Sequence, residues 1–316
     1  MPAARIGMAL VRAACALVFL GCSAMAAAQP AESHWQLDIG WGHESQTSPV
    51  FQISPEGNIL YLDGQQGLSG SHIRTSLQGS ASWNWEQGVT TALAADATLK
   101  RAPNAPGLDF ASLSIQPSIH RPFGAANVGM GLNVLSYDVG GRHFRDAMGV
   151  QADWTKSDGH QLWGVVAEWT QERHAADFSD MDATATSVVV LRQYTDPLPG
   201  IEGLDFSAIV GREVNAHGYL DLSSHSAMLT GTVRWSWLGA EWSVGRSWRE
   251  ARFEDSAFPS EPARADHTVM TDIAAQWPVA ANRSVRVEYN EVRNTSNTRL
   301  YDNTFQQLSV TLRSSW

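Results

Sequence analysis

The chain has 316 residues and a formal net charge of −10, and no stripe of basic residues runs along it. Nucleic acid is therefore excluded as an expected partner. Beyond the first 28 residues no run of about 20 apolar residues occurs, which excludes a helical membrane protein. Both cysteines, Cys15 and Cys22, lie within those first residues, so we expect neither a disulfide framework nor a thiolate metal site.

Residues 1–28 have the pattern of an export signal. Arg5 and Arg12 give a basic start, residues 13–20 are apolar, and alanines at 26–28 offer a small-residue cleavage site before Gln29. The sequence around Cys22 also resembles a lipoprotein cleavage site, so lipidation there stays open beside cleavage at the alanines. No linker or charge block divides the remainder, and we expect residues 29–316 to form one domain.

The remainder of the chain alternates apolar and polar residues in segments of about ten residues. Successive side chains of a strand point to opposite faces, so each segment predicts a strand with one apolar face. In chain order the segments are 35–41, 73–85, 89–99, 111–119, 128–134, 148–154, 163–169, 183–192, 204–210, 227–237, 240–248, 269–277, 285–289 and 308–316. Val188 to Leu191 are all apolar, which leaves the facing of 183–192 ambiguous. Pro117 predicts a bulge inside its strand.

The connections between these segments alternate in length. Short turns fall near residues 87, 123, 158, 198, 239 and 280. The intervening connections are longer or more polar: 44–70, 101–107, 138–142, 170–182, 213–225, 250–265 and 293–302. Outer-membrane barrels have short periplasmic turns and long outer loops. The sequence therefore predicts an all-β fold, a transmembrane antiparallel β-barrel of about 14 strands in the outer membrane of a Gram-negative cell, with both termini periplasmic.

Aromatic residues gather at the ends of the predicted strands, and the last strand ends on Trp316. Outer-membrane barrels carry such rings at both membrane–water interfaces. The core of a soluble sandwich, the alternative, does not explain rings at strand ends. We predict two membrane girdles, made of Trp35, Trp85, Trp237, Trp277 and Trp316 at one end and of Trp41, Trp169, Trp248 and Tyr289 at the other.

The polar faces of the predicted strands carry charges of both signs. Inside a barrel such charges must be satisfied, so we expect most of them to form a structural network around water and a minority to line a path. The predicted lumen charges include Arg74, Asp96, Arg234, Arg249, Asp272, Glu288 and Arg313. Outer-membrane lipid and the barrel-assembly machinery are the expected partners, and no cofactor is expected.

An outer-membrane hydrolase of lipids or peptides is the rival class of function, because such enzymes use His paired with Ser or Asp near the outer rim. The histidines in or near predicted outer loops are His43, His143, His174, His217 and His225. None has a local catalytic signature, and a GxSxG motif is absent, so we predict that the protein is not an enzyme. The acidic loop with Asp177, Asp180 and Asp182 lacks EF-hand spacing, and no metal site is predicted.

The last 50 residues or so carry a resemblance to a known family. Arg264-Ala265-Asp266 precedes one strand, Tyr289 ends the next, and Asn294 to Asn297 with Leu300 to Asn303 precede the last. This pattern resembles the barrel end of surface lipoprotein assembly modifiers and related barrels that follow tetratricopeptide domains. The resemblance implies a translocator that moves a lipoprotein or a polysaccharide outward. No tetratricopeptide segment precedes this barrel, so a separate periplasmic partner would have to recognise the cargo.

Overall fold

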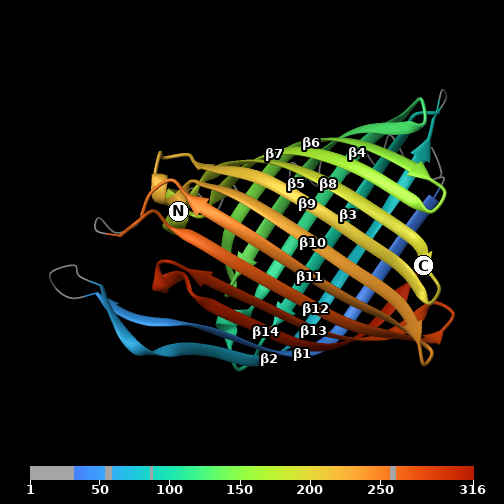
Figure 1. Cartoon of the computed structure of the whole chain (residues 1–316). Coiled ribbons are helices and arrows are strands. Elements are labelled where there is room, and N and C mark those ends of the chain that lie inside the picture. Colours follow the sequence, from blue (N-terminus) through green and yellow to red (C-terminus); the bar gives the residue numbers. More distant parts are fainter. Residues whose placement is uncertain (1–31, 54–58, 86–87, 257–260) are drawn as a thin grey trace.

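The structure, a computed structural model, describes residues 32–53, 59–85, 88–256 and 261–316. These residues form one closed antiparallel barrel in which each strand pairs with its neighbours in sequence and β14 pairs with β1 (Figure 1). The predicted fold class, an antiparallel barrel of about 14 strands, is confirmed. The predicted signal segment, residues 1–28, lies outside the described residues.

Fourteen strands make up the described barrel. They are β1 (Glu32–Ile53), β2 (Ile59–Asn84), β3 (Thr90–Arg101), β4 (Phe110–Phe123), β5 (Ala126–Val139), β6 (Arg142–Asp158), β7 (Gln161–His174), β8 (Ala183–Leu198), β9 (Ile201–Asn215), β10 (Ser224–Trp237), β11 (Ala240–Phe253), β12 (Ala265–Ala280), β13 (Arg283–Ser296) and β14 (Asn303–Ser315). Four short 3₁₀ turns lie in connections: η2 (Pro106–Leu108), η3 (Ala176–Met181), η4 (Leu220–Leu222) and η5 (Arg299–Tyr301). No helix among the described residues is long and apolar enough to cross a membrane.

The seam between the first and last strands closes the barrel. Ile39 lies opposite Leu312 and Trp41 lies opposite Val310. The ladder continues to the last residue, because Trp35 N–H donates to Trp316 O at 2.9 Å and Trp316 N–H donates to Trp35 O at 3.0 Å. The described start of β1 and the chain end therefore lie together, at the end of the barrel with the short turns (Figure 1).

The short turns use residues with positive φ. Leu238 and Gly239 join β10 to β11 with φ of 53° and 72°, which is the combination that fits the twist of a two-residue hairpin. The η turns lie at the other end of the barrel (Figure 1). The predicted alternation of turns and loops is thus present in most connections, but the predicted loop 138–142 is a tight turn at Gly140 and Gly141.

Two further expectations are wrong. The predicted loop 44–70 is strand for most of its length, because β1 continues to Ile53 and β2 starts at Ile59. Hydrogen bonds between strand backbones form whatever the side chains are. The polar residues of 44–70 therefore continue β1 and β2 beyond the part of the strands with apolar outward side chains. Pro117 causes no bulge, since Ile115 pairs with Val134 and Ser118 with Gly131 in one unshifted register.

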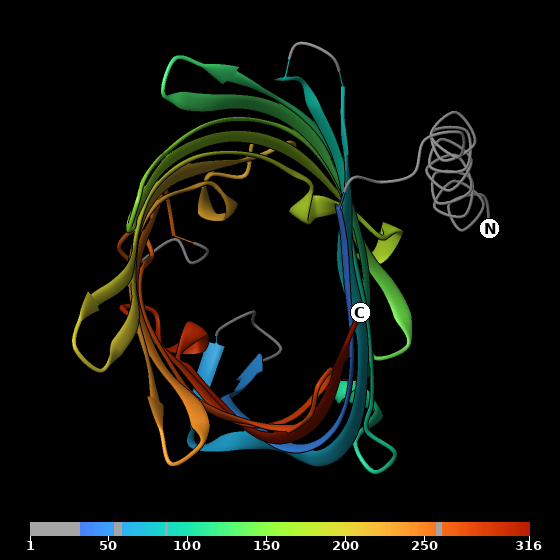
Figure 2. The same ribbon diagram turned by 90° about the vertical axis from the view of Figure 1, so that its right-hand side faces the viewer.

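The outer face of the barrel is apolar. Side chains that are large, hydrophobic and exposed recur at every second residue, as Ile39 and Trp41 do on β1 and as Leu308, Val310 and Leu312 do on β14. Their neighbours of opposite parity point into the ring of strands, which is seen along its axis in Figure 2. An apolar band of this kind on a closed barrel fits hydrocarbon, where every backbone group must be paired internally.

Candidate pore lumen

The inner wall follows from the strand register, because residues paired across strands point to the same face. Starting from Asp38, the pairs lead through Ser76 and Thr98 around the ring and back to Arg313. All seven predicted lumen charges lie on this inward parity. Inward carboxylates outnumber inward cations: the carboxylates are Glu32, Asp38, Glu44, Asp96, Asp153, Glu168, Glu172, Asp205, Glu213, Glu241, Asp266, Asp272 and Glu288, and the cations are Arg74, Lys100, Arg145, Arg234, Arg249, Arg286 and Arg313.

Three of the predicted lumen charges form ion pairs. Arg313 bridges the seam to both carboxylate oxygens of Asp38, at 3.1 and 2.9 Å. Arg234 Nη2 lies 3.4 Å from Asp205, and Glu288 lies 3.2 Å from Arg286 Nε. The other four, Arg74, Asp96, Arg249 and Asp272, have no ion pair within the described part of the chain. The predicted network of paired charges is therefore only partial.

Glu44, which the sequence predicted to lie in a loop, forms a buried ion pair with Lys100 of β3. Glu44 is 1% exposed and accepts Lys100 Nζ at 2.7 Å. His72, also 1% exposed, lies beside it with Nε2 3.1 Å from Gln307 Nε2. A side chain at Gly42 would lie 2.7 Å from His72 Nε2, so this packing requires glycine.

The β3–β4 connection covers this ion pair from the lumen side. Ala102, Ala105 and Leu108 form a buried cluster, and a Cβ at Gly70 on the inner face of β2 would lie 2.8 Å from Ala105 Cβ. Asp109 fixes the connection by accepting Ala102 N–H at 2.7 Å and Arg101 Nη1 at 2.8 Å. These two hydrogen bonds lower the pKa of the Asp109 carboxyl.

The connections at this end include η3, η4 and η5, and η4 and η5 appear inside the ring of strands in Figure 2. Asn215, which is 3% exposed, ties two of them together. Its amide nitrogen donates to Asp180 O at 2.5 Å and Asp182 O at 3.2 Å. Its side-chain oxygen accepts the backbone N–H groups of His217 and Tyr219. The loops thus narrow the lumen at one mouth.

The residues that carry the family resemblance hold the β11–β12 and β13–β14 connections together. Arg264 bonds Asp266 at 2.9 Å and lies between two rings, 3.5 Å from the centroid of Phe253 and 3.7 Å from that of Tyr301. Asn294 donates to Tyr301 O at 2.8 Å. Asp302 accepts Ser296 N–H, and Asn297 bonds Ala263 and Ala265. These contacts give the motif a structural role in the loops.

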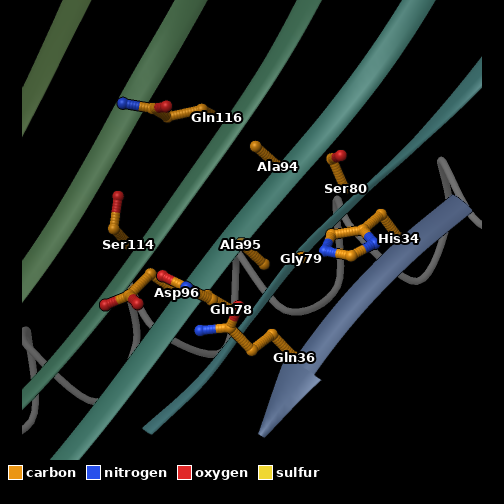
Figure 3. Close-up of a pocket in the computed structure, with 10 residues that line it drawn as sticks. All are labelled: His34, Gln36, Gln78, Gly79, Ser80, Ala94, Ala95, Asp96, Ser114 and Gln116. Atoms are coloured by element: carbon orange, nitrogen blue, oxygen red, sulfur yellow. The ribbon is translucent and has the colours of Figure 1, made fainter. Parts of the chain in front are cut away.

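A cavity of about 320 Å³ indents the inner wall between β1 and β4 (Figure 3). The small inward residues Ser80, Ala94 and Ser114 leave the space. Its polar lining is Gln36, Gln78, Gln116, Ser80, Ser114, His34 and Asp96. Gln36 donates to Asp38 at 3.1 Å, which leaves its carbonyl oxygen as an acceptor. Of this lining only Asp96 is predicted from the sequence, because uncharged inward residues carry no signal beyond their parity.

The tryptophans of the predicted girdles all lie on the outward parity. Trp237 and Trp316 are 58% and 60% exposed near the short turns, and Trp41 is 53% exposed toward the other end. Trp242, which the sequence analysis did not assign to a girdle, contacts Trp235, Trp237 and Trp277 at ring centroid distances of 5.9 to 6.4 Å. The role of these rings at a membrane interface stays a prediction.

The five histidines of the rival enzyme class do not converge. His143 lies between Asp138 and Asp146 on the rim, at 3.1 and 3.3 Å. His174 packs edge-on against Phe144, and His217 lies in the η4 loop while His225 faces outward. His43 also faces outward, with Nε2 3.1 Å from Ser69 Oγ and Nδ1 3.2 Å from Ser71 Oγ. Among the described residues, no group of three His, Cys, Asp or Glu could hold a metal.

Comparisons with known proteins find fold-level likeness only. No protein-family model matches the chain, and no curated protein matches it. Solved structures that resemble it include an anion-selective porin from Comamonas acidovorans, with 9% identity and a TM-score of 0.47 over 90% of this chain and 100% of that chain. A loop-deletion mutant of OmpT, an outer membrane protein of Vibrio cholerae, has 7% identity and a TM-score of 0.48 over 89% and 99%. OccK9 of Pseudomonas aeruginosa has 9% identity and a TM-score of 0.47, over 90% of this chain and 99% of that chain.

Proposed function

We propose that the protein is an outer-membrane channel for small hydrophilic solutes, with a preference for cations. The observation that carries the proposal is the contrast between the two faces of the closed barrel. The outer face is a band of exposed apolar side chains, and the inner face is polar and rich in carboxylates. A protein that folds in water buries its apolar side chains and exposes its polar ones. A channel in lipid requires the opposite arrangement, with apolar side chains outside and polar side chains inside.

The strand number supports an aqueous interior. Eight-stranded barrels are just wide enough for their own side chains to fill, and barrels of 16 to 18 strands leave an aqueous channel. The 14 strands of this barrel lie near the upper of these two classes. The cavities in the inner wall and the unpaired charges Arg74, Asp96, Arg249 and Asp272 add polar surface that needs water.

The sign of the lumen charge supports the cation preference. Carboxylates outnumber cations on the inward parity, and a narrow lumen with low-dielectric walls concentrates the counter-ion of its own charge. Neither Asp96 nor Asp272 has a cation within ion-pair distance among the described residues. Their field therefore reaches the solution inside the barrel.

The direct test of a channel is single-channel recording after insertion of the purified barrel into a planar bilayer. We expect stepwise conductance in KCl and none from mock-purified samples. Fractionation supplies the second test: the mature protein should be found in the outer membrane and migrate faster in gels when unheated. A monomer that is soluble without detergent, or a barrel in bilayers without conductance, would contradict the proposal.

Export of a lipoprotein or polysaccharide is the finer form of the proposal, and it follows from the family resemblance alone. It requires a periplasmic partner at the short-turn end. Co-purification of a tetratricopeptide protein with the barrel, and loss of a surface-exposed cargo when the barrel is deleted, would support it. Unchanged surface cargo in the deletion strain would reject it and leave the channel in place.

A lipid hydrolase is the second candidate function, and one observation favours it. His43 bonds the hydroxyls of Ser69 and Ser71 on the outward face, a pairing that a Ser–His nucleophile would need. No carboxylate holds the His43 ring in the described residues. Release of fatty acid from phospholipid by the purified protein, abolished by Ser69→Ala, would establish this activity; equal release by Ser69→Ala would reject it.

A further inference from the structure

The inner wall has an apolar strip on one side. Val166 pairs with Val189, Val189 with Ile209, and Ile209 with Met228, so four apolar side chains lie side by side on β7, β8, β9 and β10. All four are partly exposed and on the inward parity. The opposite wall, from β1 to β4, is lined by amides, hydroxyls and charges. The strip also explains the apolar run Val188 to Leu191, in which both faces of β8 carry hydrophobic side chains.

A carboxylate and a cavity adjoin the strip. Glu168 lies two residues from Val166 on β7, hence on the same face. Glu168 Oε1 accepts Thr170 Oγ1 at 3.2 Å and Asn133 Nδ2 at 3.5 Å, and no cation pairs with the carboxylate in the described residues. The cavity beside it measures about 220 Å³ and is lined by Glu168 and Glu172 together with Leu135, Ala147, Ala185 and Ser187. Glu172 is already neutralised by Arg145 at 2.6 Å.

We propose that this wall is a binding site for small amphipathic organic cations, with the ammonium group at Glu168 and the apolar group on Val166, Val189 and Ile209. The proposal rests on the proposed channel function and names its solute class. Apolar surface facing water inside a polar lumen is unfavourable unless a ligand covers it. A carboxylate free of protein cations at the end of that surface selects a positively charged head. Binding sites commonly combine an apolar lining with few polar groups in this way.

The test compares three probes in the planar bilayer, by the concentration that halves the KCl current. Pentylammonium and ethylammonium share a charge and differ by three methylene groups, whereas pentanoate has a similar apolar tail and the opposite charge. We expect pentylammonium to block at a concentration about tenfold below that of ethylammonium, as burial of about half the surface of three methylenes implies. Pentanoate should block weakly or not at all.

Three variants separate this site from the rest of the lumen. Glu168→Gln should bring the blocking concentrations of pentylammonium and pentanoate together. Val189→Thr keeps the side-chain shape, and it should remove most of the advantage of pentylammonium over ethylammonium. Val190→Thr makes the same change one residue along β8, where Val190 faces outward, and should change neither ratio.

Equal block by the two ammonium probes in the unaltered protein, or an equal effect of Val190→Thr and Val189→Thr, would overturn the inference and leave the channel function standing. A barrel that passes no current would contradict the channel instead. In that case equilibrium dialysis of labelled pentylammonium against the purified barrel in detergent decides the inference. Saturable binding that Glu168→Gln removes would support the site, and its absence would reject it.

Discussion

At the scale of single residues, the described structure depends on buried polar groups in segments that the sequence analysis took for loops. Glu44, in the predicted loop 44–70, is the clearest example: its side chain is only 1% exposed and pairs with Lys100 on β3. Removing one member of a buried pair leaves an uncompensated charge, which costs about 3–5 kcal/mol. Exposed pairs contribute about 0–1 kcal/mol.

We expect Lys100→Met to destabilise the barrel strongly, with a lower temperature for the loss of heat-modifiable migration in gels. The double variant Glu44→Gln/Lys100→Met should regain much of that loss, because no charge remains buried. Arg101→Met is the matched control, since Arg101 is 57% exposed in its pair with Asp109. An effect of Arg101→Met as large as that of Lys100→Met would show that burial of the pair is not the cause.

Asn215 tests the folding of the loops over the mouth. Asn215→Ala removes one donor and one acceptor that together hold four backbone groups of the η3 and η4 loops. Each buried group left without a partner costs about 1–3 kcal/mol. We expect proteases added to whole cells to cleave residues 175–182 and 216–223 faster, while the barrel stays heat-modifiable. Asn127→Ala, at an exposed inward position near a short turn, should leave cleavage unchanged.

At the scale of elements, the closing pair of strands determines whether a barrel forms at all. An open edge in lipid leaves backbone groups unpaired at several kcal/mol each. Deleting residues 312–316 should therefore prevent assembly, with the chain degraded before it reaches the membrane. Trp316→Phe should be nearly silent because a ring remains, and Trp316→Asp should lower the assembled amount severalfold. Immunoblots of outer-membrane fractions measure these amounts; normal levels of the truncated chain would contradict closure.

The register of the seam allows a sharper test, because residues 29–316 contain no cysteine. Ile39 lies directly opposite Leu312, within reach of a disulfide. We expect Ile39→Cys/Leu312→Cys to crosslink on oxidation, as read from gel mobility after heating. Ile39→Cys/Val310→Cys is offset by two residues and should crosslink far less. The opposite order of efficiency would place the seam in another register.

The strands and the direction of their side chains were predictable from sequence. Apolar residues face outward and polar residues face the lumen, so the two types alternate with a period of two along each strand. The pattern gave the short turns at residues 123, 158, 198, 239 and 280. It failed at 44–70, where polar residues continue β1 and β2 beyond the apolar band. It also missed the loop contacts of Asn215 and the packing of His72 beside Glu44, since these depend on which loops fold inward, and side-chain periodicity carries no information about that.

At the scale of the whole molecule, the proposed ion preference rests on the excess of inward carboxylates. Asp96→Asn/Asp272→Asn removes two lumen carboxylates that lack ion-pair partners in the described residues. We expect this double variant to keep its conductance steps and to prefer K⁺ over Cl⁻ less than the unaltered protein does. Asp138→Asn neutralises a carboxylate on the rim, 48% exposed, and should leave the preference unchanged. Equal changes in both variants would show that the lumen carboxylates do not cause the preference for K⁺.

The central claim, a transmembrane channel with a carboxylate-rich lumen, is tested most directly by the reversal potential of the bilayer current across a tenfold KCl gradient. The account predicts stepwise current and a reversal potential of the sign set by K⁺, with the dilute side becoming positive at zero current. The preference should weaken as salt rises, because screening shortens the reach of the lumen charges. A reversal potential of the sign set by Cl⁻, or a correctly inserted barrel without current, would contradict it.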